Sequence, residues 1–382
     1  ICYLIFYLVF TVFSVLNTFV LGTPIGGQAI ASLPSRNNNP NLKPETSNEF
    51  EIGLEMIFAK RRLGFDLSYY NKISEDLITP VTISTSTGFS SQIINAGEME
   101  NKGVEVSLWG TPVKTNDFEW RIDINWGKNE NKVLSLPQGL TNLQLGTFQG
   151  GVSINATVGE PYGTIRGTDH EYINGQPVVK ANGYYKAAPG KSVIGNFQPD
   201  WRGGINNRLT YKSLELSFLI DIQKGGDLFS LDQWYGQGTG IYANTAGLND
   251  LGNPLRDPVS QGGGEILPGV KEDGTPNDIR SYAGWYANGR GWARAVNAQH
   301  VYDAGFVKLR EVSLSYDLPT DLLKGFVQKF TITAIGRNLW IIDKSVPYAD
   351  PEAGLSSGNL QGMQSGAYPT TKDYGLSIKI EF

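Results

Sequence analysis

Residues that commonly carry catalysis are scarce in this chain of 382 residues, which has one cysteine and two histidines. The lone Cys2 excludes an internal disulfide framework and a cysteine-based zinc cluster. His170 and His300 belong to no H-E-x-x-H pattern, and the chain contains no P-loop and no G-x-S-x-G elbow. A histidine in a loop is more often solvated than a ligand. We therefore predict no enzyme, no catalytic residue, no metal and no cofactor.

An excess of positive charge is also absent, because the formal net charge is -5 and the pI is near 5.3. No stripe of Lys and Arg interleaves with aromatic residues. Binding to nucleic acid needs such a basic surface. Nucleic acid is therefore not an expected partner.

Charged residues are missing from the first part of the chain, since residues 1–21 contain no Lys, Arg, Asp or Glu. That length could span a membrane as a helix. The start Ile1-Cys2-Tyr3 lacks the basic region of a signal peptide. Two interpretations stay open, a real apolar segment or a truncated or mistranslated start. We divide the chain into an N-terminal segment, 1–36, and a main unit, 37–382.

What the sequence has in abundance favours β-structure, with 46 Gly, 18 Tyr, 17 Phe and 8 Trp. From Asn48 onward, apolar residues alternate with polar ones, which is the period of a half-buried strand. The clearest case runs from Phe118 to Trp126, with polar residues at every second position. The pattern predicts about nine or ten strands. They lie near residues 48–59, 63–80, 98–110, 118–134, 201–211, 214–224, 301–316, 330–341 and 373–382.

The last strand fixes which side of the pattern faces an apolar environment. Its apolar positions alternate with Gly375, Ser377, Lys379 and Glu381, and the chain stops on an aromatic residue. Turning Lys379 toward lipid at mid-bilayer would cost about 2 to 4 kcal/mol. A terminal aromatic on such a strand resembles the signal for assembly of outer-membrane barrels. The predicted assembly signal comprises Tyr374, Leu376, Ile378, Ile380 and Phe382.

The lengths of the connections alternate in the same way as in outer-membrane barrels, which have short periplasmic turns and long outer loops. The expected short connections are residues 60–62, 111–117, 212–213 and 317–329. The expected long ones are residues 81–97, 135–200, 225–300 and 342–372. Phe118 to Trp126 would rise roughly 20 Å when tilted, close to the height of an apolar membrane band. We therefore predict an all-β, antiparallel transmembrane barrel segment, while the alternative is a soluble β-sandwich.

Particular phrases resemble SusC/RagA-type TonB-linked outer-membrane proteins. They are Asn39-Pro40-Asn41-Leu42-Lys43-Pro44-Glu45-Thr46, Asn95-Ala96-Gly97-Glu98-Met99-Glu100-Asn101-Lys102-Gly103, Phe306-Val307-Lys308-Leu309-Arg310-Glu311-Val312-Ser313, Gly336-Arg337-Asn338-Leu339-Trp340 and Asp350-Pro351-Glu352. The matches keep the family order from about residue 37 to the end.

The resemblance implies a barrel of about 22 strands, plugged by an N-terminal domain. It also implies uptake of oligosaccharides, or sometimes peptides, through the outer membrane. The expected partners are a SusD-like surface lipoprotein and the TonB-ExbB-ExbD system. Residues 37–382 would form the C-terminal portion of that barrel, and nothing before residue 37 looks like a plug. TonB would therefore act through a part that this chain lacks.

One long segment, residues 225–300, is rich in aromatic side chains. Aromatic faces stack on sugar rings, and neighbouring polar groups bond hydroxyls. The same side chains could instead pack the segment against itself or against the lipoprotein. The substrate-binding candidates are Trp234, Tyr235, Tyr242, Trp285, Tyr286, Trp292 and Arg290.

Two other functions stay open besides nutrient import with a SusD-like partner. The first is a TonB-dependent receptor for metal chelates or cobalamin, which would share the architecture. The second is a secreted β-sandwich that binds or hydrolyses glycans. In a sandwich, the apolar faces of two sheets would meet in a dry core instead of facing lipid.

Overall fold

The computed structural model describes residues 15–283, 289–292, 295–319 and 327–382. Within them, nine antiparallel strands form one sheet, here called the wall sheet, in the order β26, β24, β23, β17, β16, β9, β8, β5 and β4. Their bounds are β4 (Thr46–Phe58), β5 (Leu63–Glu75), β8 (Glu98–Lys114), β9 (Phe118–Ser135), β16 (Trp201–Tyr211), β17 (Leu214–Lys224), β23 (Phe306–Asp317), β24 (Lys329–Lys344) and β26 (Asp373–Glu381). The prediction of an all-β antiparallel fold is confirmed.

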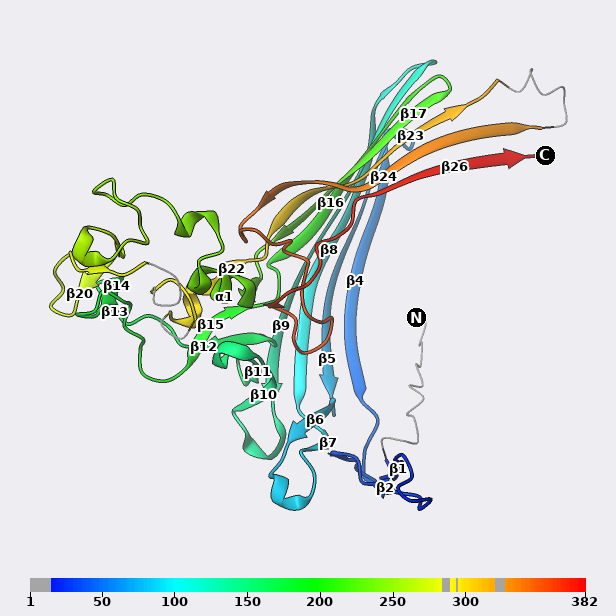
Figure 1. Cartoon of the computed structure of the whole chain (residues 1–382). Helices are drawn as coiled ribbons and strands as arrows, with labels where there is room; N and C mark the ends of the chain where they lie inside the picture. Colours follow the sequence, from blue (N-terminus) through cyan, green and yellow to red (C-terminus); the bar gives the residue numbers. More distant parts are fainter. Residues whose placement is uncertain (1–14, 284–288, 293–294, 320–326) are drawn as a thin grey trace.

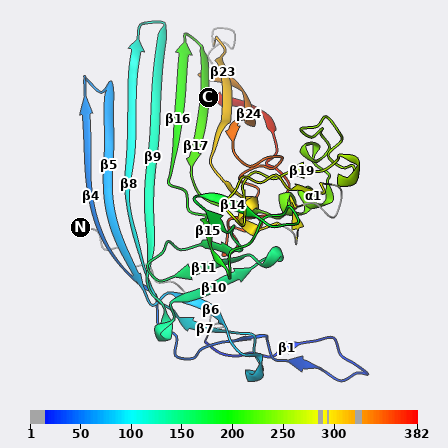
Figure 2. The same cartoon turned by 90° about the vertical axis from the view of Figure 1, so that its left-hand side faces the viewer.

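The wall sheet is curved, and its short turns gather at one end while the long connections leave the other (Figures 1 and 2). The turn from β4 to β5 is tight because Ala59, Lys60 and Arg61 all have positive φ angles. The turn from β16 to β17 comprises only Lys212 and Ser213, and Lys212 also has a positive φ. Among the described strands, β4 and β26 form the two edges of the sheet, which is open.

The two faces of the wall sheet differ as the alternation predicts. Apolar side chains of one face meet across strands, as in the pairs Ile205 with Ile124 and Leu216 with Leu314. No second sheet covers this face in the described part of the chain, and Phe50 is 62% exposed and Leu376 71% exposed. A soluble protein rarely exposes such a continuous apolar surface. The observation contradicts the β-sandwich alternative.

Two predicted strands extend too far, and the strand expected over residues 98–110 is too short, because β8 continues to Lys114 and leaves only residues 115–117 as the connection. The strand expected over residues 63–80 ends at Glu75, because Asp76 has a left-handed φ of 55° and Ile78–Thr82 (β6) pairs with Ser91–Asn95 (β7). The strand expected over residues 301–316 is divided, because Val301–Asp303 (β22) belongs to another sheet. Asp303 Oδ1 accepts a hydrogen bond from the Gly305 amide at 2.6 Å, which turns the chain there.

The long connections fold upon one another into what we call the loop body, the described residues of 136–200, 225–305 and 345–372. It holds the one helix labelled α1 (Leu231–Thr239), which Ser230 caps by accepting from the Gln233 amide. A four-stranded sheet, here called the loop sheet, has the order β10, β11, β12 and β15. Its strands are β10 (Asn142–Thr147), β11 (Ser153–Thr157), β12 (Thr164–Gly167) and β15 (Ser192–Asn196). The smaller strands are β13 (Tyr172–Ile173), β14 (Gln176–Val179), β18 (Asp227–Ser230), β19 (Glu265–Ile266), β20 (Val270–Lys271), β21 (Arg280–Ser281) and β25 (Met363–Gln364).

The main hydrophobic core lies in the loop body and draws on all three connections. Ile154 comes from the first, Phe229 from the second and Met363 from the third, and all three are fully buried. β25 joins β18 in parallel, which adds backbone pairing to this contact. The long connections therefore form one packed body, although they are far apart in sequence.

The described residues before β4 lie beside the long-connection end of the wall sheet, where β1 and β2 are labelled (Figure 1). Residues 1–14, which carry most of the expected apolar segment, lie outside the described residues. Val20–Leu21 (β1) pairs with Ala31–Ser32 (β2), and Arg36–Asn37 (β3) pairs with β7. Within the described residues, no helix is both long enough and apolar enough to span a membrane.

Candidate functional site

The polar face of the wall sheet carries paired charges. Arg208 Nε lies 3.6 Å from Glu215 Oε1 on the neighbouring strand, and Arg337 Nε lies 2.8 Å from Glu311 Oε2. These residues help to line a hollow of about 550 Å³. Mixed charges and amides form a surface for water and polar solutes, as expected for the inside of a pore.

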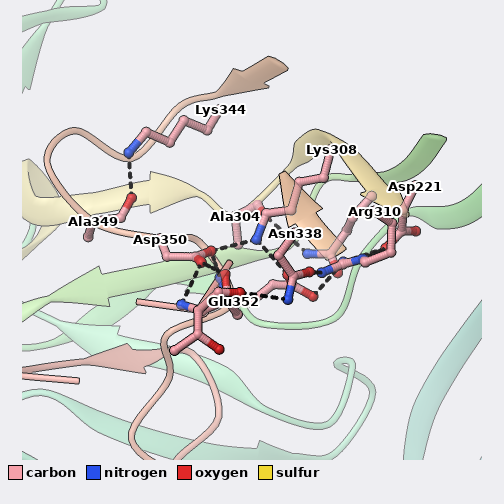
Figure 3. A network of polar contacts seen from close by, with 12 residues as sticks. Asp221, Ala304, Lys308, Arg310, Asn338, Lys344, Ala349, Asp350 and Glu352 are labelled. Carbon is pink, nitrogen blue, oxygen red and sulfur yellow. Dashed lines mark hydrogen bonds and ion pairs between the residues drawn. The ribbon is translucent and has the colours of Figure 1, made fainter. Parts of the chain in front are cut away.

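A buried ion network joins this face to the loop body (Figure 3). Lys308 Nζ lies 2.6 Å from Asp350 Oδ1 and 2.5 Å from Glu352 Oε2. Arg310 extends the network, donating to both oxygens of Glu352 at 2.8 and 2.9 Å and to Asp221 on β17. Its guanidinium also donates to Asn338 Oδ1 at 3.1 Å. Four segments of the chain thus meet at two cationic side chains.

A β-bulge produces this arrangement. Leu309 and Glu311 pair with consecutive residues of β17, so Arg310 is an extra residue on β23. A bulge of this kind redirects side chains. As a result, the side chains of Lys308, Arg310 and Glu311 all make polar contacts on the polar face. Strict alternation would place Arg310 and Glu311 on opposite faces.

The charges of the network are compensated despite their burial. Burial raises the pKa of Asp350, but hydrogen bonds from Lys308, from the Thr370 hydroxyl and from the Glu352 amide outweigh it and hold that pKa at about 2. The pKa of Glu352 is also lowered, since bonds from Arg310 and Lys308 outweigh its burial. Both carboxylates are therefore ionised at neutral pH.

A pocket of about 490 Å³ lies beside the network, between the wall sheet and the loop body. Its lining mixes polar and apolar side chains, with Phe306 and Phe197 as the aromatic members. The polar members include Arg202, Asp221, Gln223, Asp227, Glu352, Gln361 and Gln364. Such a mixed lining can contact both the polar groups and the apolar faces of a solute.

Among the described aromatic candidates, Trp234, Tyr235 and Trp292 lie together, but they pack in and against the loop-body core. Trp234 is buried in the loop-body core at 6% exposure, where Tyr235 meets it edge to face at 4.8 Å. Trp292 packs against the same core. Tyr242 stacks on Tyr348 with ring centroids 4.5 Å apart.

The remaining candidates differ in what can be said of them. Arg290 forms an ion pair with Glu265 at 2.5 Å, within the second connection. Trp285 and Tyr286 lie outside the described residues. Tyr235 is 39% exposed, so a solute could reach part of its side chain.

The histidines give no metal site in the part of the chain that the structure describes, where no group of three ligand residues occurs. His170 meets Tyr185 edge to face at 4.7 Å. The expectation of a solvated loop histidine is wrong for His300, which is 2% exposed. Burial lowers its pKa to about 4.

Sequence reasoning missed the ion network, although all of its members except Asp221 lie within the phrases that resemble the family. Lys308 and Arg310 stand two apart among apolar residues, and Asp350 and Glu352 stand two apart around a proline. Two cations and two carboxylates at matching spacing were the available signal. The sequence does not show that the segment with Lys308 and Arg310 contacts the segment with Asp350 and Glu352 in the folded chain.

Comparisons with known proteins agree on the family. Residues 17–339 match the family model described as TonB dependent receptor-like, beta-barrel. TonB-dependent receptor P3 of Formosa agariphila is 27% identical over 90% of this chain, and TonB-dependent receptor P26 of the same organism is 29% identical over 91%. TonB-dependent receptor SusC of Bacteroides thetaiotaomicron is 31% identical over 30% of the chain. The chain covers 35% of receptor P3 and 36% of receptor P26, about a third of their length.

Solved structures agree on the fold. The RagAB peptide importer in its closed-closed state superposes with a TM-score of 0.70 at 21% identity. The superposition covers 97% of this chain and 39% of that one. At this identity the likeness extends to the fold alone.

Proposed function

Because the chain belongs to the TonB-dependent receptor β-barrel family, we propose that the whole protein imports oligosaccharides or peptides through the outer membrane. The observation that carries the proposal is the two-faced wall sheet. Its apolar face is exposed at Phe50 and Leu376, and its polar face bears paired charges and a hollow of about 550 Å³. An exposed apolar face fits lipid, and a charged face fits a water-filled lumen.

In the whole protein, the wall sheet would be part of a closed barrel of about 22 strands. Support comes from β4 and β26, whose outer edges have no strand partner among the described residues. An open edge would leave backbone groups unpaired in hydrocarbon, at a cost of several kcal/mol each. Further strands of the same protein would pair with them. The assembly signal proposed at Tyr374 to Phe382 would then lie on a strand with a neighbour on each side.

The proposed partner of the loop body is a SusD-like surface lipoprotein, and the proposed energy source is TonB acting through another part of the protein. Exposed apolar side chains support a protein partner. Ile241 is 74% exposed, Leu248 68% and Leu251 60%, and all three lie in one short stretch of the loop body. Exposed apolar groups close together often mark an interaction surface.

The test is deletion of the gene, followed by growth on individual glycans and peptides as the sole carbon source. We expect growth to be lost on one cargo class and restored by the gene in trans. Loss of cobalamin or iron-chelate uptake, with normal growth on every glycan and peptide, would instead support the metal-chelate alternative. Fractionation and heat-dependent migration of the whole product on gels test the barrel separately, and a product found only in the soluble fraction would overturn it.

A further inference from the structure

The polar face of the loop sheet holds an open pocket that the ion network does not touch. It has a volume of about 270 Å³. Three strands and the segment before β15 supply its lining, which is Asn142, Gln144, Ser153, Asn155, Arg166 and Lys191. The pocket size is close to the lower end of ligand sites, so it suits one unit of a larger cargo.

Hydrogen bonds orient the amides of this pocket. Ser153 donates to Asn155 Oδ1 at 2.8 Å, and Asn155 Nδ2 donates to Asn142 Oδ1 at 3.2 Å. The Thr157 hydroxyl donates to the same Asn142 oxygen at 2.6 Å. Because neighbours occupy the amide oxygen of Asn142, its exposed NH₂ group remains to donate outward.

Two cations complete the lining, and no carboxylate is among the lining residues. Arg166 makes no ion pair or side-chain hydrogen bond with any described residue. Lys191 donates to the Gly151 carbonyl, which uses one of its three N–H bonds. By contrast, the pocket beside the ion network contains Asp221, Asp227 and Glu352. The loop-sheet pocket therefore offers donors and positive charge.

The platform beneath this pocket is rigid. Ile154 and Ile165, on the two central strands, point to the opposite face and are fully buried in the loop-body core. Arg166 and Ser153 are register partners, so their spacing is set by backbone pairing. Groups held on packed strands lose little entropy when a ligand binds.

We propose that this pocket binds an anionic group, a carboxylate or a sulfate ester, on an oligosaccharide cargo. Arg166 would pair with the anion in the bidentate manner that guanidinium allows, and Lys191 would add charge. The amides of Asn142 and Gln144 would bond ring hydroxyls, which favours an acidic sugar over a peptide. The inference rests on the proposed import function and narrows its cargo.

The test uses the whole gene product, purified from outer membranes in detergent. The probes are trigalacturonate, sulfated galactotriose and neutral galactotriose, and a tripeptide with a free or an amidated C-terminus. The variant is Arg166→Gln with Lys191→Gln. Lys180→Gln is the matched control, since it removes a cation of the loop body that does not line the pocket. Arg166→Lys tests whether charge alone suffices.

We expect the acidic trisaccharides to bind the unmodified protein and to lose roughly tenfold in affinity in the double variant. Lys180→Gln should bind as the unmodified protein does, and Arg166→Lys should retain part of the affinity. Heat-dependent migration of each variant should be unchanged, because the substituted residues lie in the loop body and not in the wall sheet. Equal binding of acidic and neutral sugars, or unchanged affinity in the double variant, would overturn the inference.

Three further outcomes distinguish an error in this inference from an error in the import function. If only the free-carboxylate tripeptide binds and the variant abolishes that binding, the anion belongs to a peptide and the assignment to sugar is wrong. If gene deletion abolishes growth on a cargo but the double variant restores it fully, import stands and the pocket has no role. If deletion of the gene changes growth on no glycan and on no peptide, the proposed import function is wrong, whatever the pocket binds.

Discussion

Lys308 Nζ and Asp350 Oδ1 lie 2.6 Å apart, and both side chains are only 2% exposed. The pair joins β23 of the wall sheet to the connection between β24 and β26. A buried ion pair adds little or no stability compared with an apolar pair of similar volume, but removal of one partner leaves an uncompensated charge. The contact therefore makes the position of this connection depend on both residues.

Lys308→Met is expected to destabilise the docking of residues 345–372 by about 3 to 5 kcal/mol. Lys308→Met with Asp350→Leu should recover part of that loss, since no buried charge then lacks its partner. Hydrogen exchange and limited proteolysis within 345–372 measure the effect. Lys372→Met, an exposed position in the same connection, is the control and should behave as the unmodified protein. A double variant no more stable than the single one would show that the two residues are not coupled.

The orientation of the wall sheet predicts opposite results for two neighbouring residues of β26. Leu376→Arg would place a charge on the exposed apolar face, at a cost of about 2 to 4 kcal/mol near the bilayer centre. Ser377→Arg would place it on the polar face, where Thr333 is its register partner. The yield of heat-modifiable protein in the outer membrane should fall only for Leu376→Arg. Equal yields would contradict the assignment of the apolar face to lipid.

Two adjacent aromatic residues distinguish packing from cargo binding. Trp234→Ala should destabilise the loop body by about 3 to 5 kcal/mol, because the indole fills the core. Tyr235→Ala should cost clearly less stability than Trp234→Ala, since Tyr235 is 39% exposed and loses mainly its edge-to-face contact with Trp234. Thermal unfolding and cargo binding of the two variants separate these roles. Loss of binding in Tyr235→Ala without loss of stability would support the predicted substrate contact, whereas unchanged binding would leave Tyr235 as a surface residue.

The loop body should weaken in mild acid because of His300. Burial lowers the pKa of His300 to about 4, whereas the unfolded chain has an ordinary value near 6.5. As the pH falls, His300 is therefore protonated in the unfolded chain before it is protonated in the folded chain. The free energy of unfolding keeps its full His300 contribution above about pH 6.5 and loses it as the pH falls toward 4. The loss attributable to this residue approaches about 3 kcal/mol.

His300→Gln is expected to remove that pH dependence while leaving an uncharged polar side chain. Proteolysis of the loop body at stepped pH values between 7.5 and 4.5 measures it. Asp350 does not affect this measurement. Its pKa of about 2 means that its contribution to the free energy of unfolding is lost only at lower pH. An unchanged pH profile in His300→Gln would show that other groups cause the acid sensitivity.

Strand positions were predictable where alternation was strong. The interval Phe118 to Trp126 lies inside β9, and residues 201–211 and 214–224 coincide with β16 and β17. Prediction failed at strand ends, where local geometry decides. Apolar residues occur on both sides of Asp76, from Ile73 to Val81. The left-handed Asp76 and the Asn95 side chain, which donates to the Asp76 carbonyl at 2.8 Å, divide them into two strands. A pattern of hydrophobicity carries no record of such a bend.

The two-faced strands and the alternation of short and long connections follow from the order of the residues alone, because side-chain direction follows from the two-residue period of extended backbone. Long-range packing in the folded chain sets which connections pack together, buries Trp234 in their core and brings Lys308 to Asp350. It also brought Arg166 and Lys191 to one pocket. These contacts join residues far apart in the chain, and their formation depends on packing and on a bulge at Arg310, which no local pattern encodes.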